Sequence, residues 1–392
     1  MTASFKILFK QNLFCSHTPH LWIHTAAGEK YVQKPLWRTR QKENFLIAGV
    51  MMAMLLMCAM PGSAFAQPAT DHPVVDLRTW PKPDIDLSRL PNTEQNRLIK
   101  KGQDLFVHTS EYLGPEVLDR SKRYAGTSMS CSSCHREAGT MPYAAPLVGT
   151  YGVYPQFQPR FGKTVTLENR INLCFTHSLS GRLVPEDSAE MKAIAAYIEY
   201  LSRGVPKGAK LIGEKEMVVE EPKRAANLVR GAEVYTQQCA VCHGDDGLGK
   251  RVGMVGDRKG YIFPPVWGSD ATSESASMFR ILSTFQYVYV NMPFGKATYA
   301  KPALSKDDAY DVAGFVISHP RQPREGEVAK DFSNPYDKPE DFPWGPYIDS
   351  FSETQHKYGP YDEIRAEIAT AREKFRKEKE TQSNLSSAPV LK

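Results

Sequence analysis

Residues 131–135 read Cys-Ser-Ser-Cys-His, and residues 239–243 repeat the pattern as Cys-Ala-Val-Cys-His. C-x-x-C-H is the attachment signal for a c-type haem: two thiols bond to the haem vinyl groups, and the adjacent histidine ligates the iron. A zinc site would need cysteine pairs separated by roughly 12–20 residues, whereas these pairs stand about a hundred apart. A thioredoxin-like redox pair would not explain the two histidines. The sequence therefore predicts two covalently bound haems, attached at Cys131, Cys134, Cys239 and Cys242, with iron ligands His135 and His243.

The sequence around each motif predicts the helices of a small cytochrome c domain. Residues 93–107 and 223–236 read as helices ahead of the two motifs. Closing helices follow Ser188 and Ser305, the second in an S-x-x-D capping pattern and ending before Pro320. The predicted fold class is mostly α, with two cytochrome c-like haem domains in tandem and an extended C-terminal tail.

Composition shifts and Pro/Gly-rich stretches divide the chain into five parts. Residues 361–380 carry an apolar stripe at helical spacing, which favours packing on this protein over docking of a partner. The predicted parts are a leader (1–66), an N-terminal haem domain (67–205), a linker (206–222), a C-terminal cytochrome c domain (223–322) and a wrapping tail with a charged helix (323–392).

The leader resembles an export signal. A basic stretch from Arg38 precedes the apolar run Phe45–Met60, and small residues follow at Ala64 and Ala66. This order predicts a signal peptide cleaved after Ala66, a periplasmic location and no membrane span in the mature chain. The alternative is an uncleaved anchor, since the apolar run approaches the length of a short spanning helix. Residues 1–35 show no domain pattern and suggest an over-long start.

The charge distribution argues against nucleic-acid binding. The formal net charge is +5, but residues 1–66 hold seven Lys or Arg and two Glu, which leaves 42 basic and 42 acidic residues in the remainder. A nucleic-acid partner would require a net basic face. Hydrophobic residues make up 41% and charged residues 24%, a balance typical of a globular protein and not of a disordered or fibrous one.

Candidates for the second ligand of each iron lie downstream of the motifs. Met292, within Asn-Met-Pro, stands 49 residues after His243, where a cytochrome c domain presents its second ligand, and Met254 and Met278 are worse placed. For the first haem, Cys174 lies about forty residues after Cys131 and is the one cysteine beyond the leader outside a C-x-x-C-H motif. A buried free cysteine is more often an inert small hydrophobe. His177 is its main rival as ligand.

The segment around Cys174 also resembles a known family, the dihaem thiosulfate dehydrogenases. The resemblance covers most of residues 95–325. It rests on Tyr154-Pro155, Arg160-Phe-Gly162, Thr166-Leu-Glu168, Arg170-Ile-Asn172, Cys174-Phe175, Ser178, Ser188-x-Glu190-Met191, Phe263-Pro-Pro-Val-Trp-Gly268, Asn291-Met-Pro-Phe-Gly295 and Ser318-His-Pro-Arg321.

The resemblance implies a catalytic haem in the first domain and an electron-exit haem in the second. It implies oxidation of two thiosulfate to tetrathionate, in a reaction that can be reversible, with electrons passing to an external acceptor such as a small cytochrome or another periplasmic redox protein. The implied residues are His135 with Cys174 at the first iron, His243 with Met292 at the second, and Arg160, Arg170 and Ser178 around the anionic substrate.

Two departures from the family pattern stand out. The family usually has Arg-Ser-Met-Asn-Gly after Cys-Phe-x, whereas residues 177–181 read His-Ser-Leu-Ser-Gly. Asn291 precedes Met292, so no lysine is available there for ligand exchange.

Elementary chemistry agrees with the implied roles. Guanidinium forks match the oxygens of an oxyanion, although a haem propionate or a surface ion pair is an equally good partner for either arginine alone. A thiolate ligand lowers a haem potential and a methionine raises it, which orders electron flow from the first haem to the second. A thiolate can also attack a sulfur centre.

Three alternatives remain open at this point. A plain electron-transfer cytochrome would have an occupied, non-exchanging sixth ligand at both irons. A dihaem peroxidase would need an open iron site, for which the Cys174 segment gives no reason. The thiolate-haem subunit of a sulfur-oxidising complex would need a partner protein that carries the sulfur substrate.

Overall fold

The computed structural model describes residues 72–323 and 331–386. The predicted leader and the cleavage after Ala66 lie outside these residues. Over the ranges that are described, no helix is both long and apolar enough to cross a bilayer.

Around the first motif, two long helices pack against each other and three short helices complete the α structure. Thr93 caps α2 by accepting from the Asn96 N–H at 3.2 Å, and Ser188 caps α6 by accepting from the Met191 N–H at 3.1 Å. The predicted helices before and after the motif are therefore confirmed. The elements are α2 (Glu94–Val107), α3 (Thr109–Leu113), α4 (Arg136–Gly139), α5 (Leu167–Leu173) and α6 (Ala189–Leu201).

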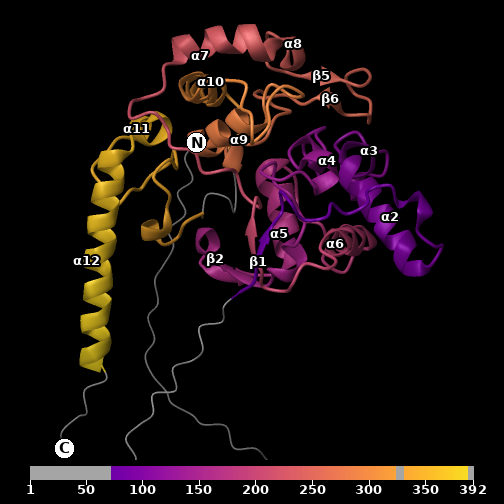
Figure 1. Ribbon diagram of the computed structural model, residues 1–392, viewed down its shortest axis with the longest axis horizontal. Coiled ribbons are helices and arrows are strands. Elements are labelled where there is room, and N and C mark those ends of the chain that lie inside the picture. The colour runs from indigo at the N-terminus through magenta and orange to yellow at the C-terminus, as the bar shows by residue number, and fades with distance from the viewer. Residues whose placement is uncertain (1–71, 324–330, 387–392) are drawn as a thin grey trace, which may run out of the picture. The chain divides into compact units, whose positions relative to one another are not determined.

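Around the second motif the arrangement is repeated, with α7 packed on α10 (Figure 1). α7 begins at Leu228, later than predicted, because the Asn227 side chain caps it. Ser305 caps α10 as the S-x-x-D pattern predicted, by accepting from the Asp308 N–H at 3.0 Å. The helices are α7 (Leu228–Val234), α8 (Ala240–His243), α9 (Ile281–Asn291) and α10 (Lys306–Ser318).

Both helix pairs cross at a glycine. A Cβ on Gly102 of α2 would lie 1.9 Å from the Ala193 carbonyl oxygen of α6. A Cβ on Gly231 of α7 would lie 2.2 Å from the Asp311 carbonyl oxygen of α10. Real Cβ atoms do not approach backbone this closely, so only glycine permits either crossing.

The strands are short and form three two-stranded sheets. β1 (Val74–Asp76) runs parallel to β4 (Lys210–Ile212), so part of the predicted linker pairs with the start of the described chain. β2 (Gln156–Gln158) and β3 (Lys163–Val165) form an antiparallel hairpin that leads into α5. β5 (Lys250–Arg251) and β6 (Tyr261–Phe263) form a second hairpin after the second motif.

The tail after residue 330 packs on the second domain. α11 (Glu353–Tyr358) precedes the long α12 (Asp362–Ser386; Figure 1). Ile364 and Ile368 of α12 are buried in the same core as Phe285 and Tyr310. The apolar stripe of the tail thus covers this protein's own core, as its spacing predicted.

We expect Gly231→Ala to destabilise the protein. The added methyl group would force α7 away from Asp311, and overpacking of this kind costs about 1–3 kcal/mol of unfolding free energy. Thermal unfolding of the dihaem protein should show a lower Tm. Val229→Ala, at an exposed position of the same helix, is the control; equal Tm values for the two variants would contradict the close crossing.

Candidate functional site

Both motif histidines are oriented by backbone carbonyls. Nδ1 of His135 lies 2.5 Å from the Ala145 carbonyl oxygen, and Nδ1 of His243 lies 2.8 Å from that of Pro264. A carbonyl can only accept, so Nδ1 carries the proton in each ring and Nε2 is left as the metal-binding nitrogen. Both rings are therefore prepared as iron ligands.

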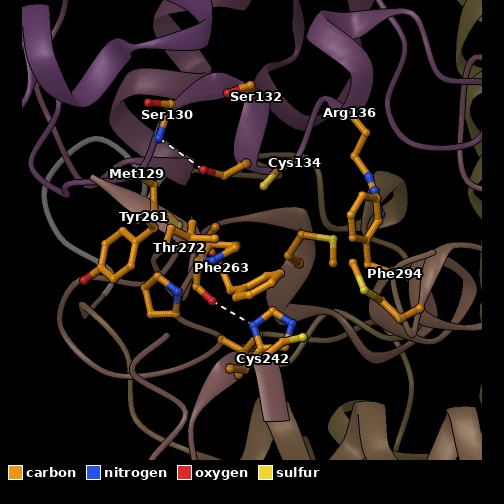
Figure 2. A pocket seen from close by; sticks show the side chains of 18 of the residues that line it. Met129, Ser130, Ser132, Cys134, Arg136, Cys242, Tyr261, Phe263, Thr272 and Phe294 are labelled. Atoms are coloured by element: carbon orange, nitrogen blue, oxygen red, sulfur yellow. Dashed lines mark hydrogen bonds between the residues drawn. The ribbon is translucent and has the colours of Figure 1, made fainter. Parts of the chain in front are cut away.

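One cavity of about 760 Å³ reaches both motifs. Cys134 of the first motif lines it, together with Cys239, Cys242 and His243 of the second. Figure 2 shows Cys134 and Cys242 on facing sides of the space. This volume is typical of a cofactor site, and the thiols and imidazole are the groups that a c-type haem uses. The residues present therefore fit the second haem.

Three methionines line the same cavity, Met129 in the segment before the first motif and Met278 and Met292 after the second. Met254 is 80% exposed and does not line it. The loop of Met292 is anchored by the buried Asn291, whose side-chain N–H₂ donates to the Tyr143 carbonyl at 3.1 Å and to the Tyr287 carbonyl at 3.2 Å. Asn291, directly before Met292, thus acts as a structural anchor of this loop.

Further contacts tie the first motif to the loop of Met292. The Tyr287 hydroxyl donates to the Cys134 carbonyl at 3.1 Å. The Arg136 guanidinium lies 3.8 Å from the centre of the Phe294 ring, at the edge of the cavity (Figure 2). The two haem-binding segments are therefore in direct contact.

Cys174 lies at the junction of two kinds of helix. Thr166 and Asn169 form a capping box that starts α5, and the chain continues from Cys174 to Ser178 as a π-helical turn, in which the Leu179 N–H donates to the Cys174 carbonyl at 3.0 Å. The thiol lies within hydrogen-bonding range of His135 and accepts from Arg170 Nη1 at 3.4 Å. The structure thus brings Cys174 to the ring of the first motif.

The charge state of Cys174 differs from that of the motif thiols. Burial favours its neutral form, but the charge of Arg170, the neighbouring His135 and the hydrogen bond from Arg170 outweigh burial and lower its pKa to about 7. Burial raises the pKa of Cys131 to about 12 and that of Cys134 to about 11. Cys174 is therefore the cysteine of this domain whose surroundings favour a thiolate.

The two predicted substrate arginines differ in their partners. Arg170 is exposed as a residue, but protein atoms surround its guanidinium group. The charge of Cys174 raises the pKa of Arg170, and the partial loss of water around the guanidinium lowers it by less. Arg160 is held by Nη2, which donates to Asp331 at 2.5 Å and to the Ser275 carbonyl at 2.6 Å, while its Nε is buried without a partner. Burial lowers the pKa of Arg160, and repulsion from Arg170 adds to this effect, so the two cations share one region.

His177 is buried and turned toward the tail. Its Nε2 lies 3.2 Å from Asp331 Oδ1, and its Nδ1 lies 3.0 Å from Thr176 Oγ1. Burial lowers its pKa, more than the Asp331 carboxylate raises it. The ring is therefore neutral near pH 7. Ser178, the fourth predicted site residue, is half-buried, and its hydroxyl forms no hydrogen bond within the described residues.

Sequence reasoning missed Asp331 and assigned no role to Tyr154. Asp331 contacts both Arg160 and His177 from the tail, 171 and 154 residues away in sequence. No local pattern indicates such a pairing. Tyr154 lies beside Arg170, and its place in a quoted motif was the one available signal.

The repeated helix pairs, the two C-x-x-C-H motifs and the shared cavity define a dihaem c-type cytochrome. A family model described as "SoxA/TsdA, cytochrome c domain" matches residues 121–206, and one described as "Cytochrome C oxidase, cbb3-type, subunit III" matches residues 226–316. These matches confirm two cytochrome c domains in tandem, each carrying a covalently bound haem.

Proteins named thiosulfate dehydrogenase are similar over both domains. The one from Stutzerimonas stutzeri is 36% identical over 245 residues, which is 62% of this chain and 74% of that protein. The one from Allochromatium vinosum is 38% identical over 204 residues, which is 50% of this chain and 72% of that protein. The chain belongs to the thiosulfate dehydrogenase family of oxidoreductases.

A solved structure is also similar, that of thiosulfate dehydrogenase (TsdBA) from Marichromatium purpuratum in its as-isolated form. The TM-score is 0.55 at 26% identity, and the match covers 63% of this chain and 50% of the other. This chain therefore corresponds to half of that longer chain.

Proposed function

We propose that this protein is an exported dihaem enzyme that joins two thiosulfate ions into tetrathionate. One bond forms between the outer sulfurs, and the two electrons released leave through the haems to an external acceptor. The observation that carries the proposal is the position of Cys174, which lies between Arg170 and His135 and favours the thiolate.

The proposed ligands of the first iron are His135 and Cys174. These two side chains would hold the iron when the haem is bound, and they already lie near enough for His135 to lower the pKa of the Cys174 thiol. His177, the rival, has both ring nitrogens engaged, by Thr176 and Asp331. Its position therefore supports the thiolate as ligand.

The proposed substrate clamp is Arg170 with Arg160 and Ser178. Two thiosulfate ions bring four negative charges together, so the site must offer cations that are not already neutralised. Arg170 meets this condition in part: it has no carboxylate partner among the described residues, and the Cys174 thiolate offsets some of its charge. Arg160 is partly neutralised by Asp331 but retains donors, and the Ser178 hydroxyl is available. The two N–H groups on one edge of a guanidinium can bond two oxygens of the pyramidal SO₃ end of such an anion.

Electrons are proposed to leave through the second haem, ligated by His243 and Met292. The haems supply one-electron redox chemistry when bound, and a methionine ligand gives the higher potential. Met292 is favoured over Met278 because Asn291 fixes its loop beside Tyr287, whereas the Met278 carbonyl is engaged by Thr284 and Arg321.

The proposed location is the periplasm, after cleavage following Ala66. With cleavage at this position, the proposed parts of the mature protein are residues 67–205, 206–222, 223–322 and 323–392. The proposed electron acceptor is a small cytochrome or another periplasmic redox protein.

One alternative has a specific observation in its favour. The family model that matches the first domain also includes SoxA, so a thiolate-haem subunit acting on a protein-bound sulfur remains the second candidate. Turnover of free thiosulfate with an artificial electron acceptor, without any partner protein, separates the two functions.

We expect Cys174→Gly to abolish thiosulfate oxidation. The variant should retain both haems by mass, because neither thioether is altered, and lose the thiolate-to-iron charge-transfer band. Activity should fall to near background. If this variant kept its spectrum and activity while His177→Ala lost both, the first iron would be histidine-ligated and an electron-transfer role would be the better interpretation.

We expect Arg170→Ala to raise the KM for thiosulfate by about tenfold or more, because a hydrogen bond to a charged group contributes roughly 1.5–3 kcal/mol. The charge-transfer band should remain, since the iron ligands are unchanged. Arg182→Ala, which removes an exposed guanidinium elsewhere on this domain, is the matched control. An unchanged KM would remove Arg170 from the substrate clamp.

We expect Met292→Gly to lower the potential of one haem and to remove its methionine-type spectrum, because a strong-field thioether ligand is lost. Redox titration of the mature protein measures this shift. Met278→Gly is the matched control, as Met278 lines the same cavity. A potential that falls in the control variant instead would identify Met278 as the ligand.

A further inference from the structure

Arg321 is a buried cation without an anionic partner. Its residue is 9% exposed, and it lines the cavity that reaches both haem motifs. Nη1 donates to Thr272 Oγ1 at 2.7 Å and to the Met278 carbonyl at 3.0 Å. Nε is buried with no hydrogen-bond partner, and Nη2 forms no hydrogen bond within the described residues. The family resemblance included Arg321 but assigned it no role.

Two half-buried arginines of the described chain are paired with carboxylates. Arg160 donates to Asp331, and Arg280 donates to Asp341. Near Arg321, Cys134 and then Glu274 interact with it only through charge, and neither forms an ion pair with it in the described part of the chain. Burial lowers the pKa of Arg321 to about 10, which shows that its protein surroundings do not compensate its charge. A buried, unpaired charge costs several kcal/mol, so such a group is expected to meet an anion.

The cavity limits what that anion can be. All attachment groups of the second haem line it (Cys239, Cys242 and His243), whereas of the groups assigned to the first haem Cys134 alone does. The haem brings two propionate carboxylates, and bidentate pairing with carboxylate is the strongest interaction available to a guanidinium. The substrate region lies elsewhere, around Arg170 and Cys174.

We propose that Arg321 anchors a propionate carboxylate of the haem attached at Cys239 and Cys242. Thr272 and the Met278 carbonyl fix Nη1, which leaves the remaining donors of the fork for the carboxylate. The paired cation favours the reduced, less positive iron and therefore raises the potential of this haem. It also keeps the propionate ionised, so the potential does not vary with pH near neutrality.

The test is redox titration of the mature dihaem protein with the substitution Arg321→Gln. The titration is repeated at several pH values from about pH 5 to about pH 8, because an unpaired propionate near haem would ionise in this range. Both haems should stay attached. The methionine-ligated haem should have a lower potential, and that potential should fall as pH rises, because the unpaired propionate ionises within the range. Arg258→Gln, which removes an exposed arginine of the same domain, should change neither property.

Arg321→Met serves as a second variant if the glutamine variant does not mature, because it keeps the apolar stem without an orphan donor. An unchanged potential and a flat pH profile at the second haem would overturn the proposal. A shift confined to the thiolate-ligated haem would overturn the assignment to the second one. A raised KM for thiosulfate with both potentials unchanged would show that Arg321 serves the substrate instead.

Discussion

The close approach of two helix backbones at Gly102 and at Gly231 is the constraint on which both haem sites depend. Each glycine lets the helix before a motif cross the closing helix of its domain at a separation that no side chain permits. About one turn after each glycine, an aromatic residue lies near the haem motif: Phe106 in α2, and Tyr235 directly after α7. The Phe106 ring lies 5.8 Å from that of His135, and the Tyr235 hydroxyl donates to the Gly244 carbonyl at 2.7 Å. The crossing therefore sets where each proximal histidine stands.

The charged side chains around Cys174 are distributed unevenly. Asp331 neutralises Arg160 and engages His177, so the side of the thiolate pocket nearest the tail carries little net charge. Arg170 has no carboxylate partner among the described residues and retains its charge beside Cys174. The tail thus leaves Arg170 as the cation of this pocket without a carboxylate partner among the described residues. In the proposed function, it is the charge that an entering anion would meet.

The features that the sequence predicted were local ones. The haem motifs need five adjacent residues, and the capping pattern at Ser305 needs four. The π-helical turn at Cys174–Ser178 was not foreseen, because its periodicity differs from an α-helix by less than one residue per turn. Asp331 could not be found either, since a pair separated by 171 residues leaves no trace in the spacing of either segment. The sequence showed Arg321 as part of a motif. That it is buried and has no carboxylate partner among the described residues is known only from the structure.

The contacts between the two haem-binding segments explain why the sites should be treated as one electrostatic unit. Tyr287 bonds to the backbone of Cys134, Asn291 bonds to that of Tyr143, and Arg136 covers Phe294 beside the loop of Met292. Charges act over longer distances where the dielectric constant is low, as it is inside a protein. Arg321 lies in the cavity that these segments share. On the proposed assignment, its charge would offset that of a propionate beside the second iron and so keep the potential of that haem from falling. The proposed thiolate and methionine ligands would separate the two potentials in the same sense.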